Sequence, residues 1–191
     1  MKKPYLLSIT AILYLILTAG LLLANDTDVE DIDAFRQAVT MNSNDAQAHF
    51  NLGVAWGKIG MYAQAAKSYK QTIRINPDNA KAHYKLGVAL GNLGMHAEAI
   101  KAYKKAIKIE PDGAMAHFNL GVAWGNLDKY KEAAESFRQA IRINPDDIMA
   151  HYKLGYLYVR LKDSDSALEQ YRILRRLDPE HAEELYYKIY K

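Results

Sequence analysis

Residues 49–57, HFNLGVAWG, occur a second time without any change at residues 117–125. Two similar segments, HYKLGVALG and HYKLGYLYV, begin at His83 and His151, so four related segments start 34 residues apart. A period of roughly 20 to 50 residues is typical of stacked arrays of small structural units. The chain is therefore expected to fold as an array in which each unit buries its apolar face against its neighbours.

Each 34-residue unit carries two helical patterns separated by a short turn. In the first unit Leu52 and Trp56 share one helical face, and Ala65 and Tyr69 share a face of the second helix. Pro77 ends that helix, because proline lacks the backbone donor and disfavours helix in the residue before it. The predicted units are residues 46–79, 80–113, 114–147 and 148–181.

These units resemble the tetratricopeptide repeat family over residues 46–181. In the first unit, the family's spacing is matched by Leu52, Gly53, Trp56, Ala65, Tyr69 and Pro77. The fourth unit keeps the pattern but has Leu174 where alanine is usual. The resemblance implies an all-α fold, a right-handed superhelical solenoid of antiparallel helix pairs whose first helices line a concave groove. It also implies a protein–protein interaction scaffold rather than an enzyme.

An uncharged run at residues 5–24 follows Lys2 and Lys3 and precedes a cluster of acidic residues. Twenty helical residues span about 30 Å, the thickness of the hydrocarbon core of a bilayer. Residues 1–25 are therefore predicted to be an N-terminal hydrophobic helix that anchors the chain, with the repeats extracytoplasmic, or periplasmic if the source is bacterial. Two alternatives remain open: a signal peptide cleaved after Ala24, giving a secreted or periplasmic protein, and a buried helix packed on the first repeat.

Both ends of the array are predicted to carry capping helices. Residues 26–45 are interpreted as an acidic linker and an N-terminal capping helix, in which Phe35 and Ala38 fall at the positions of Tyr69 and Thr72. Residues 182–191 are predicted to form a C-terminal capping helix with Leu185 facing the array.

The family resemblance places one stripe of each first helix in the concave groove. In this chain the stripe contains an aromatic residue in every repeat, flanked by valines, and we call Phe50, Tyr84, Phe118 and Tyr152 the aromatic ladder. This composition indicates a protein or peptide partner with apolar anchors. The Lys/Asn/Arg clamp with which some family members bind acidic C-termini is not transferred, because Phe50 and Val54 stand at its positions. The predicted groove residues are Phe50, Val54, Gly57, Tyr84, Val88, Gly91, Phe118, Val122, Gly125, Tyr152 and Tyr156.

Three of these residues, Gly57, Gly91 and Gly125, are not required by the family pattern. A glycine inside a helix costs about 1 kcal/mol relative to alanine, so their retention needs an explanation. One interpretation is room for the side chains of a partner. The other is relaxed selection followed by copying during repeat duplication.

Several other signals are interpreted as structural. His49, His83, His117 and His151 recur with the repeat, but metal ligands must converge on one ion at about 2.0–2.1 Å, so packing is expected and no metal or cofactor is predicted. Trp56 and Trp124 are predicted to lie in the core. The lysines between Lys101 and Lys108 are expected to form a solvated face, with anionic lipid or an acidic partner as the minor alternative.

The composition excludes several classes of function. A net charge of +3 is too small for a nucleic-acid-binding surface, and the absence of cysteine excludes disulfides and thiolate metal sites. No glycine-rich phosphate loop or catalytic set is recognisable, so no catalytic residue is predicted. The alternatives to a scaffold are a self-assembling structural protein, joined through the caps or through Tyr186, Tyr187 and Tyr190, and an accessory subunit of a cell-envelope complex.

Overall fold

The computed structural model describes residues 26–191, and the predicted N-terminal hydrophobic helix lies outside them. Ten helices and no strands are present in this described part. None of these helices is both long enough and apolar enough to cross a membrane. The contacts divide the chain into two compact units, one ending at Asp78 and the other comprising Asn79–Lys191, which we call unit 1 and unit 2.

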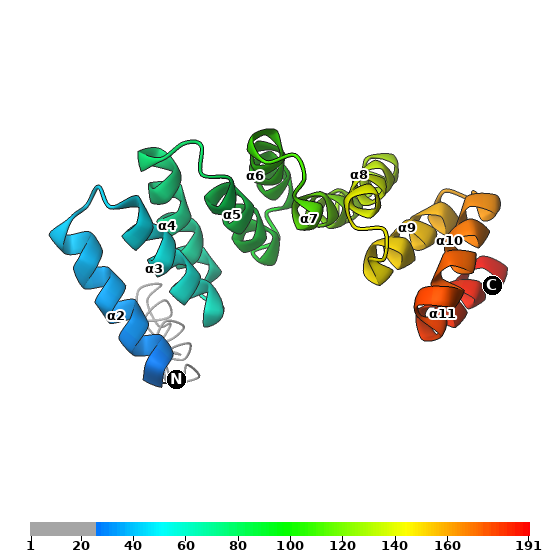
Figure 1. The fold of residues 1–191 in the computed structure, drawn as a ribbon, viewed down its shortest axis with the longest axis horizontal. Coiled ribbons are helices and arrows are strands. Elements are labelled where there is room, and N and C mark those ends of the chain that lie inside the picture. The colour runs from blue at the N-terminus through cyan, green and yellow to red at the C-terminus, as the bar shows by residue number, and fades with distance from the viewer. Residues whose placement is uncertain (1–25) are drawn as a thin grey trace, which may run out of the picture. The chain divides into compact units, whose positions relative to one another are not determined.

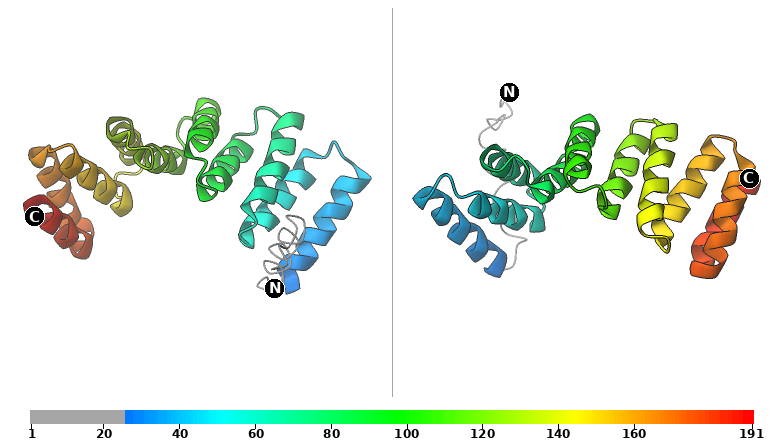
Figure 2. Two further views of the ribbon diagram at one scale, coloured as in Figure 1. Left: turned by 180° about the vertical axis from the view of Figure 1, so that it is seen from behind. Right: turned by 45° about the horizontal axis from the view of Figure 1, so that its top comes forward.

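Within each unit the helices follow one another as hairpins joined by short turns (Figures 1 and 2). Unit 1 contains α2 (Asp26–Met41), α3 (Ala46–Lys58) and α4 (Tyr62–Ile75). Unit 2 contains α5 (Ala80–Asn92), α6 (His96–Ile109), α7 (Ala114–Gly125), α8 (Tyr130–Ile143), α9 (Ile148–Arg160), α10 (Ser164–Leu177) and α11 (Pro179–Tyr190).

Three of the first helices begin at a side-chain cap. The side chains of Asp45, Asn79 and Asp147 accept hydrogen bonds from the third backbone N–H of α3, α5 and α9, at 2.9, 2.9 and 3.0 Å. Such caps satisfy one of the backbone donors that a helix start leaves without a partner. At α7 the cap position is Gly113, which makes no side-chain hydrogen bond.

The first helices end at a residue in the left-handed conformation. Gly60 and Gly94 fill this position in the first two repeats, with φ of 74° and 73°. The third and fourth repeats use Asp128 and Lys162 instead, with φ of 56° and 60°. Glycine adopts this conformation without the steric penalty of a Cβ, so the sequence signal is clear in only two of the four turns.

The two helices of a repeat approach each other at a glycine. A Cβ added at Gly87 in α5 would lie only 2.5 Å from the ring of Tyr103 in α6, and at Gly53 it would lie 2.6 Å from Tyr69. Both tyrosines are buried, with exposed fractions of 3–4%. The glycines are therefore required by packing, as the family resemblance implies.

The substitution of Gly87 by alanine is expected to destabilise the protein by about 1–3 kcal/mol, because the new methyl group overlaps the Tyr103 ring. Gly91 lies one turn further along the same helix, and there a Cβ would meet nothing closer than the Tyr103 hydroxyl at 3.7 Å. Gly91→Ala is therefore expected to stabilise by about 1 kcal/mol through helix propensity. Chemical denaturation of the two variants measures both effects, and equal effects would contradict the packing described here.

The fourth repeat departs from this pattern. A Cβ at Gly155 would collide with Leu185, which comes from α11 and not from the second helix of the same repeat. Leu174, Ala182 and Leu185 form a fully buried cluster on which Tyr171 packs while remaining half-buried. Thus Tyr171 stands at the family's packing position in the sequence, but its ring lies 5.2 Å from that of Tyr186 on α11.

The described ends of the array pack on the adjacent repeats. In unit 1, Ile32 of α2 is 1% exposed, and the Asp31 carboxylate lies 3.7 Å from the Lys58 ammonium group on α3. In unit 2, α11 begins at Pro179, three residues before the cap that the sequence predicts at residues 182–191. The side chain of Asp178 caps α11 by accepting from the backbone N–H groups of Glu180 and His181.

Candidate functional site

All eleven residues predicted to line a groove are half-buried. Half-burial is what a concave wall requires, because such a side chain packs on its own helix and leaves one face open. Three of these residues lie on α3 in unit 1, and eight lie on α5, α7 and α9 in unit 2. The eight residues of unit 2 can be placed relative to one another.

An apolar pocket of about 160 Å³ lies between α5, the end of α6 and the start of α7. Tyr84 of the predicted ladder forms part of its wall, and the pocket also includes Met115, a residue of α7 that is 57% exposed. The lining residues are Ala80, Lys81, Tyr84, Ala106, Glu110, Gly113, Met115 and Ala116.

A second, more polar hollow of about 230 Å³ lies further along the same two first helices. It brings together three predicted groove residues, Val88 and Gly91 from α5 and Val122 from α7. We call it the polar hollow, and its lining residues are Val88, Gly91, Asn92, His96, Tyr103, Asn119, Val122, Ala123 and Asn126.

A hydrogen bond links the two cavities. The Asn119 side-chain amide, in the wall of the polar hollow, donates to the hydroxyl of Tyr84, in the wall of the apolar pocket, at 3.0 Å. Burial raises the pKa of Tyr84, and the donated hydrogen bond acts in the opposite direction. This bond connects Tyr84 of α5 directly to Asn119 of α7.

Two polar groups in the polar hollow have no hydrogen-bond partner within the described part of the chain. One is the buried Nδ1 of His96, at the start of α6. The other is the hydroxyl of Tyr103, which lies 3.7 Å from the place of a Gly91 Cβ, and burial raises the pKa of this phenol well above its ordinary value. The Asn92 amide, by contrast, donates to the Val88 carbonyl at 2.9 Å.

The remaining groove residues of α7 lie close by but play different parts. Phe118 packs edge-on against Phe137 of α8 with ring centroids 5.3 Å apart; Phe137 belongs to the apolar core of unit 2, and Phe118 lies on that core while remaining half-buried. Gly125 is outside the lining of the polar hollow, and a Cβ there would have no neighbour within 4 Å. The backbone at Gly125 therefore faces open space.

Tyr152, the ladder residue of the fourth repeat, contacts the C-terminal helix α11. The ring of Tyr152 stacks edge-on against His181 at 5.3 Å, and the Lys188 ammonium group lies 5.5 Å from the ring centroid of Tyr156. Burial, reinforced by a hydrogen bond to Glu184, raises the pKa of Tyr152 to about 12. Tyr152 and Tyr156 are thus partly covered by α11, whereas Tyr84 borders an open pocket.

The periodic histidines hold the turns before the first helices. The Nε2 atoms of His49, His117 and His151 lie 3.1, 3.0 and 2.9 Å from the carbonyl oxygens of Ser43, Pro111 and Pro145, each six residues earlier. In the described residues no group of three or more histidine and acidic side chains could hold a metal ion. The histidines act here through hydrogen bonds to the preceding turn.

The two tryptophans differ in burial. Trp56 is buried at 4% exposure, as predicted, with the Arg36 guanidinium 4.8 Å from its ring centroid. Trp124 is only half-buried, and the Lys104 ammonium group lies 4.9 Å from its ring centroid. One lysine of the predicted solvated face therefore covers an aromatic ring.

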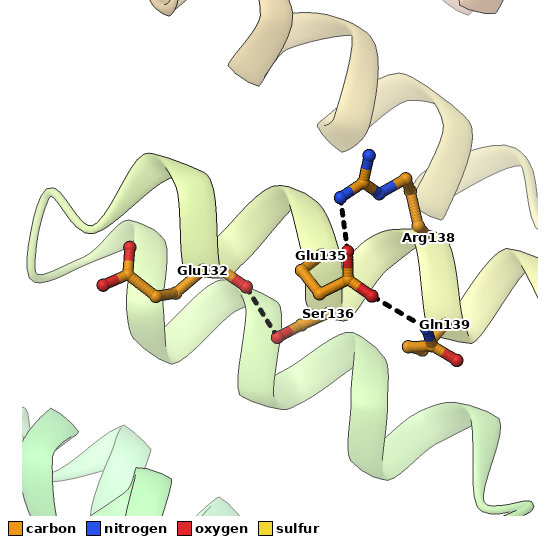
Figure 3. A network of polar contacts seen from close by, with 5 residues as sticks. All are labelled: Glu132, Glu135, Ser136, Arg138 and Gln139. Carbon is orange, nitrogen blue, oxygen red and sulfur yellow. Dashed lines mark hydrogen bonds and ion pairs between the residues drawn. The ribbon is translucent and has the colours of Figure 1, made fainter.

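Outside the groove, α8 carries a polar network on its exposed side (Figure 3). Glu135 pairs with Arg138 and accepts a 2.8 Å hydrogen bond from Gln139, while the Ser136 hydroxyl donates to the Glu132 carbonyl at 2.8 Å. The hydrogen bonds from Gln139 and Arg138 lower the pKa of Glu135. The contacts of Glu135 with Arg138 and Gln139 lie within α8 and stabilise this helix by only about 0.2–0.5 kcal/mol per pair. Arg138 also shares a hydrogen bond with Tyr158 of α9, so the network reaches the next helix.

Six residues of the polar hollow are not among the eleven predicted groove residues, namely Asn92, His96, Tyr103, Asn119, Ala123 and Asn126. The predicted residues all lie on first helices, whereas His96 and Tyr103 reach the hollow from α6. The sequence did distinguish Asn119, because this position of the repeat is asparagine in the third repeat but lysine, Lys85 and Lys153, in the second and fourth repeats.

These observations define a helical solenoid built from two-helix repeats, with one apolar and one more polar cavity between α5, α6 and α7. Family models described as tetratricopeptide repeat match residues 80–112 and 149–181, and a model described as TPR repeat matches residues 58–94 and 126–162. The chain belongs to the tetratricopeptide repeat family. No curated protein sequence matches it.

Solved structures share this fold. A crystal structure of MamA is 24% identical, with a TM-score of 0.76 over 80% of this chain and 89% of that one. MamA from Desulfovibrio magneticus RS-1, from residue 41 to its end, is 21% identical, with a TM-score of 0.76 over 92% and 98% of the two chains. YrrB, described as a TPR protein with an unusual peptide-binding site, is 23% identical, with a TM-score of 0.74 over 83% and 81%.

Proposed function

We propose that this protein is an interaction scaffold that binds a peptide segment of a partner protein along α5 and α7 of unit 2. The observation that carries the proposal is the adjacency of two cavities on these helices, one apolar and one polar, linked by the bond between Tyr84 and Asn119. YrrB, which has the same fold, is described as having a peptide-binding site, and this agrees with such a role.

The size of the cavities favours a peptide over a free small molecule. Sites for small molecules usually enclose about 300–1,000 Å³, and the two cavities measure about 160 and 230 Å³. Each is suited to one side chain of a longer ligand. An extended or helical segment with an apolar anchor in the pocket and a polar residue in the hollow fits this arrangement.

Photo-crosslinking in the native cell tests the proposal. A photoreactive residue at position 118, on α7, is expected to give one discrete adduct with a partner protein. The matched control is position 105 on the exposed side of α6, which is expected to give none. Adducts from position 105 alone would contradict a ligand in the groove.

Self-assembly is the second candidate, because three tyrosines of α11 are exposed. Tyr186, Tyr187 and Tyr190 have exposed fractions of 42%, 61% and 64%, and the rings of Tyr186 and Tyr190 lie 4.6 Å apart. An adduct between two copies of this chain, formed from position 118 or from position 187, would favour this second function.

We also propose that the scaffold is held at a membrane with its repeats on the extracytoplasmic side. The support is the uncharged run at residues 5–24, with lysines before it and acidic residues after it. A reporter fused after Lys191 that is active only in the cytoplasm would refute this location.

A further inference from the structure

We infer that the polar hollow is a subsite for a carboxylate, the side chain of an aspartate or glutamate in the bound segment. The inference rests on the function proposed above and specifies the chemistry of the ligand. It comes from the hydrogen-bonding groups that line the hollow and from the charges around it.

The lining of the hollow is rich in hydrogen-bond donors and contains no acidic side chain. The Tyr103 hydroxyl has no hydrogen-bond partner among the described residues, and a phenol is protonated at neutral pH, so this hydroxyl is available to donate. The amides of Asn92 and Asn119 use one N–H each, for the Val88 carbonyl and the Tyr84 hydroxyl. Each amide has a second N–H, and Asn126 adds another carboxamide at the exposed rim.

Access to these donors depends on Gly91. The Tyr103 hydroxyl would lie 3.7 Å from a Cβ at this position, so any longer side chain would stand between the groove and the phenol. Glycine leaves the hydroxyl open to a group that enters from the groove. A buried carboxylate is stable only when several donors reach it, and this hollow offers them from three helices.

The three helices that line the hollow carry a net positive charge. The charged residues of α5 are Lys81 and Lys85, and α7 carries no charged residue at all. On α6, Glu98 is outnumbered by four lysines between residues 101 and 108. None of these lysines lines the hollow, so they act only at long range, where the positive balance of the three helices attracts an anion and repels a lysine side chain.

Three pools of synthetic peptides test the inference with the full-length chain in a nonionic detergent. The peptides are nine residues long, carry a neutral BODIPY label and have glutamate, glutamine or lysine fixed at the centre. The flanking positions are equal mixtures of alanine, leucine, tyrosine and asparagine. By fluorescence anisotropy, the glutamate pool is expected to bind about fivefold or more tightly than the glutamine pool, because hydrogen bonds to charged groups are stronger than neutral ones.

Two variants separate the hollow from the exposed lysines of α6, which also attract acidic peptides. Tyr103→Phe removes one donor and keeps the ring, as Phe137 does naturally in the third repeat. It is expected to reduce the preference for glutamate severalfold, and Asn126→Asp is expected to reverse it. Lys105→Gln is the matched control on the outer side of α6 and is expected to retain the preference.

The outcomes distinguish the two proposals. Equal binding of the glutamate and glutamine pools, or a preference for glutamate that survives Tyr103→Phe and Asn126→Asp unchanged, overturns the carboxylate subsite and leaves the scaffold function standing. If the lysine pool binds most tightly, the subsite is likewise overturned. If no pool binds, the carboxylate subsite is overturned, and if position 118 also gives no adduct in the cell, the scaffold function fails with it.

Discussion

Replacing Leu185 with alanine is expected to lower the free energy of unfolding by about 2–5 kcal/mol, the range typical of fully buried leucines. Leu185 has an exposed fraction of 0%, fills the space beside Gly155 and packs with Leu174. The cavity left by alanine opens between α9, α10 and α11, where few atoms can move in to refill it. Urea unfolding followed by circular dichroism measures the loss.

Tyr187→Ala is the control on the same helix, because Tyr187 is largely exposed. It is expected to change the free energy of unfolding by less than about 0.5 kcal/mol. If Leu185→Ala cost no more than this control, α11 would not be docked on the fourth repeat as described. A separate first transition in urea, in which only part of the helical circular dichroism signal is lost, would indicate that α11 detaches before the rest unfolds. Stacked arrays permit such local unfolding.

The double variant Gly91→Leu and Gly125→Leu is expected to abolish partner binding, reducing the adduct from position 118 at least tenfold. Both positions are open: a Cβ at Gly91 meets only the Tyr103 hydroxyl at 3.7 Å, and one at Gly125 meets nothing within 4 Å. Leucine side chains can therefore occupy the groove without disturbing the helices. Leucine is also a better helix former, so the fold is expected to be as stable as before or more stable.

The matched control is Gly91→Ala with Gly125→Ala, which adds the helix propensity but little volume. It is expected to retain most of the binding. Unchanged crosslinking in the leucine variant, with intact circular dichroism, would mean that the partner does not use these positions. The glycines would then be neutral features that spread with the repeats.

The sequence predicted the helix pairs well because every repeat carries its own local signals. Apolar spacing and a proline after the second helix, such as Pro77, act within one 34-residue unit, so no distant contact was needed. Turn chemistry was less visible, since Asp128 and Lys162 adopt the left-handed conformation that glycine marks in the other repeats.

The site was predictable only in part. The positions of the predicted groove residues came from the family resemblance, and all eleven of these residues are half-buried. The cavities depend instead on which side chains meet across α5, α6 and α7. Asn119 contacts Tyr84, which lies 35 residues earlier in the chain, and His96 and Tyr103 reach the polar hollow from α6. Such contacts between helices cannot be read from the spacing of apolar residues within one helix.

The exceptional packing of Gly155 matters for anyone who builds longer arrays from this chain. Modules cut from residues 80–147 each carry the ring that their own glycine needs, Tyr103 or Phe137. In a module cut from residues 148–181 no aromatic ring lies beside Gly155, and the space there is filled mainly by Leu185 from the helix that follows. Residues 148–190 therefore belong together as one piece, whereas the two preceding repeats each contain their own glycine–ring contact and could be multiplied in front of it, provided that each still has a neighbour on which to pack.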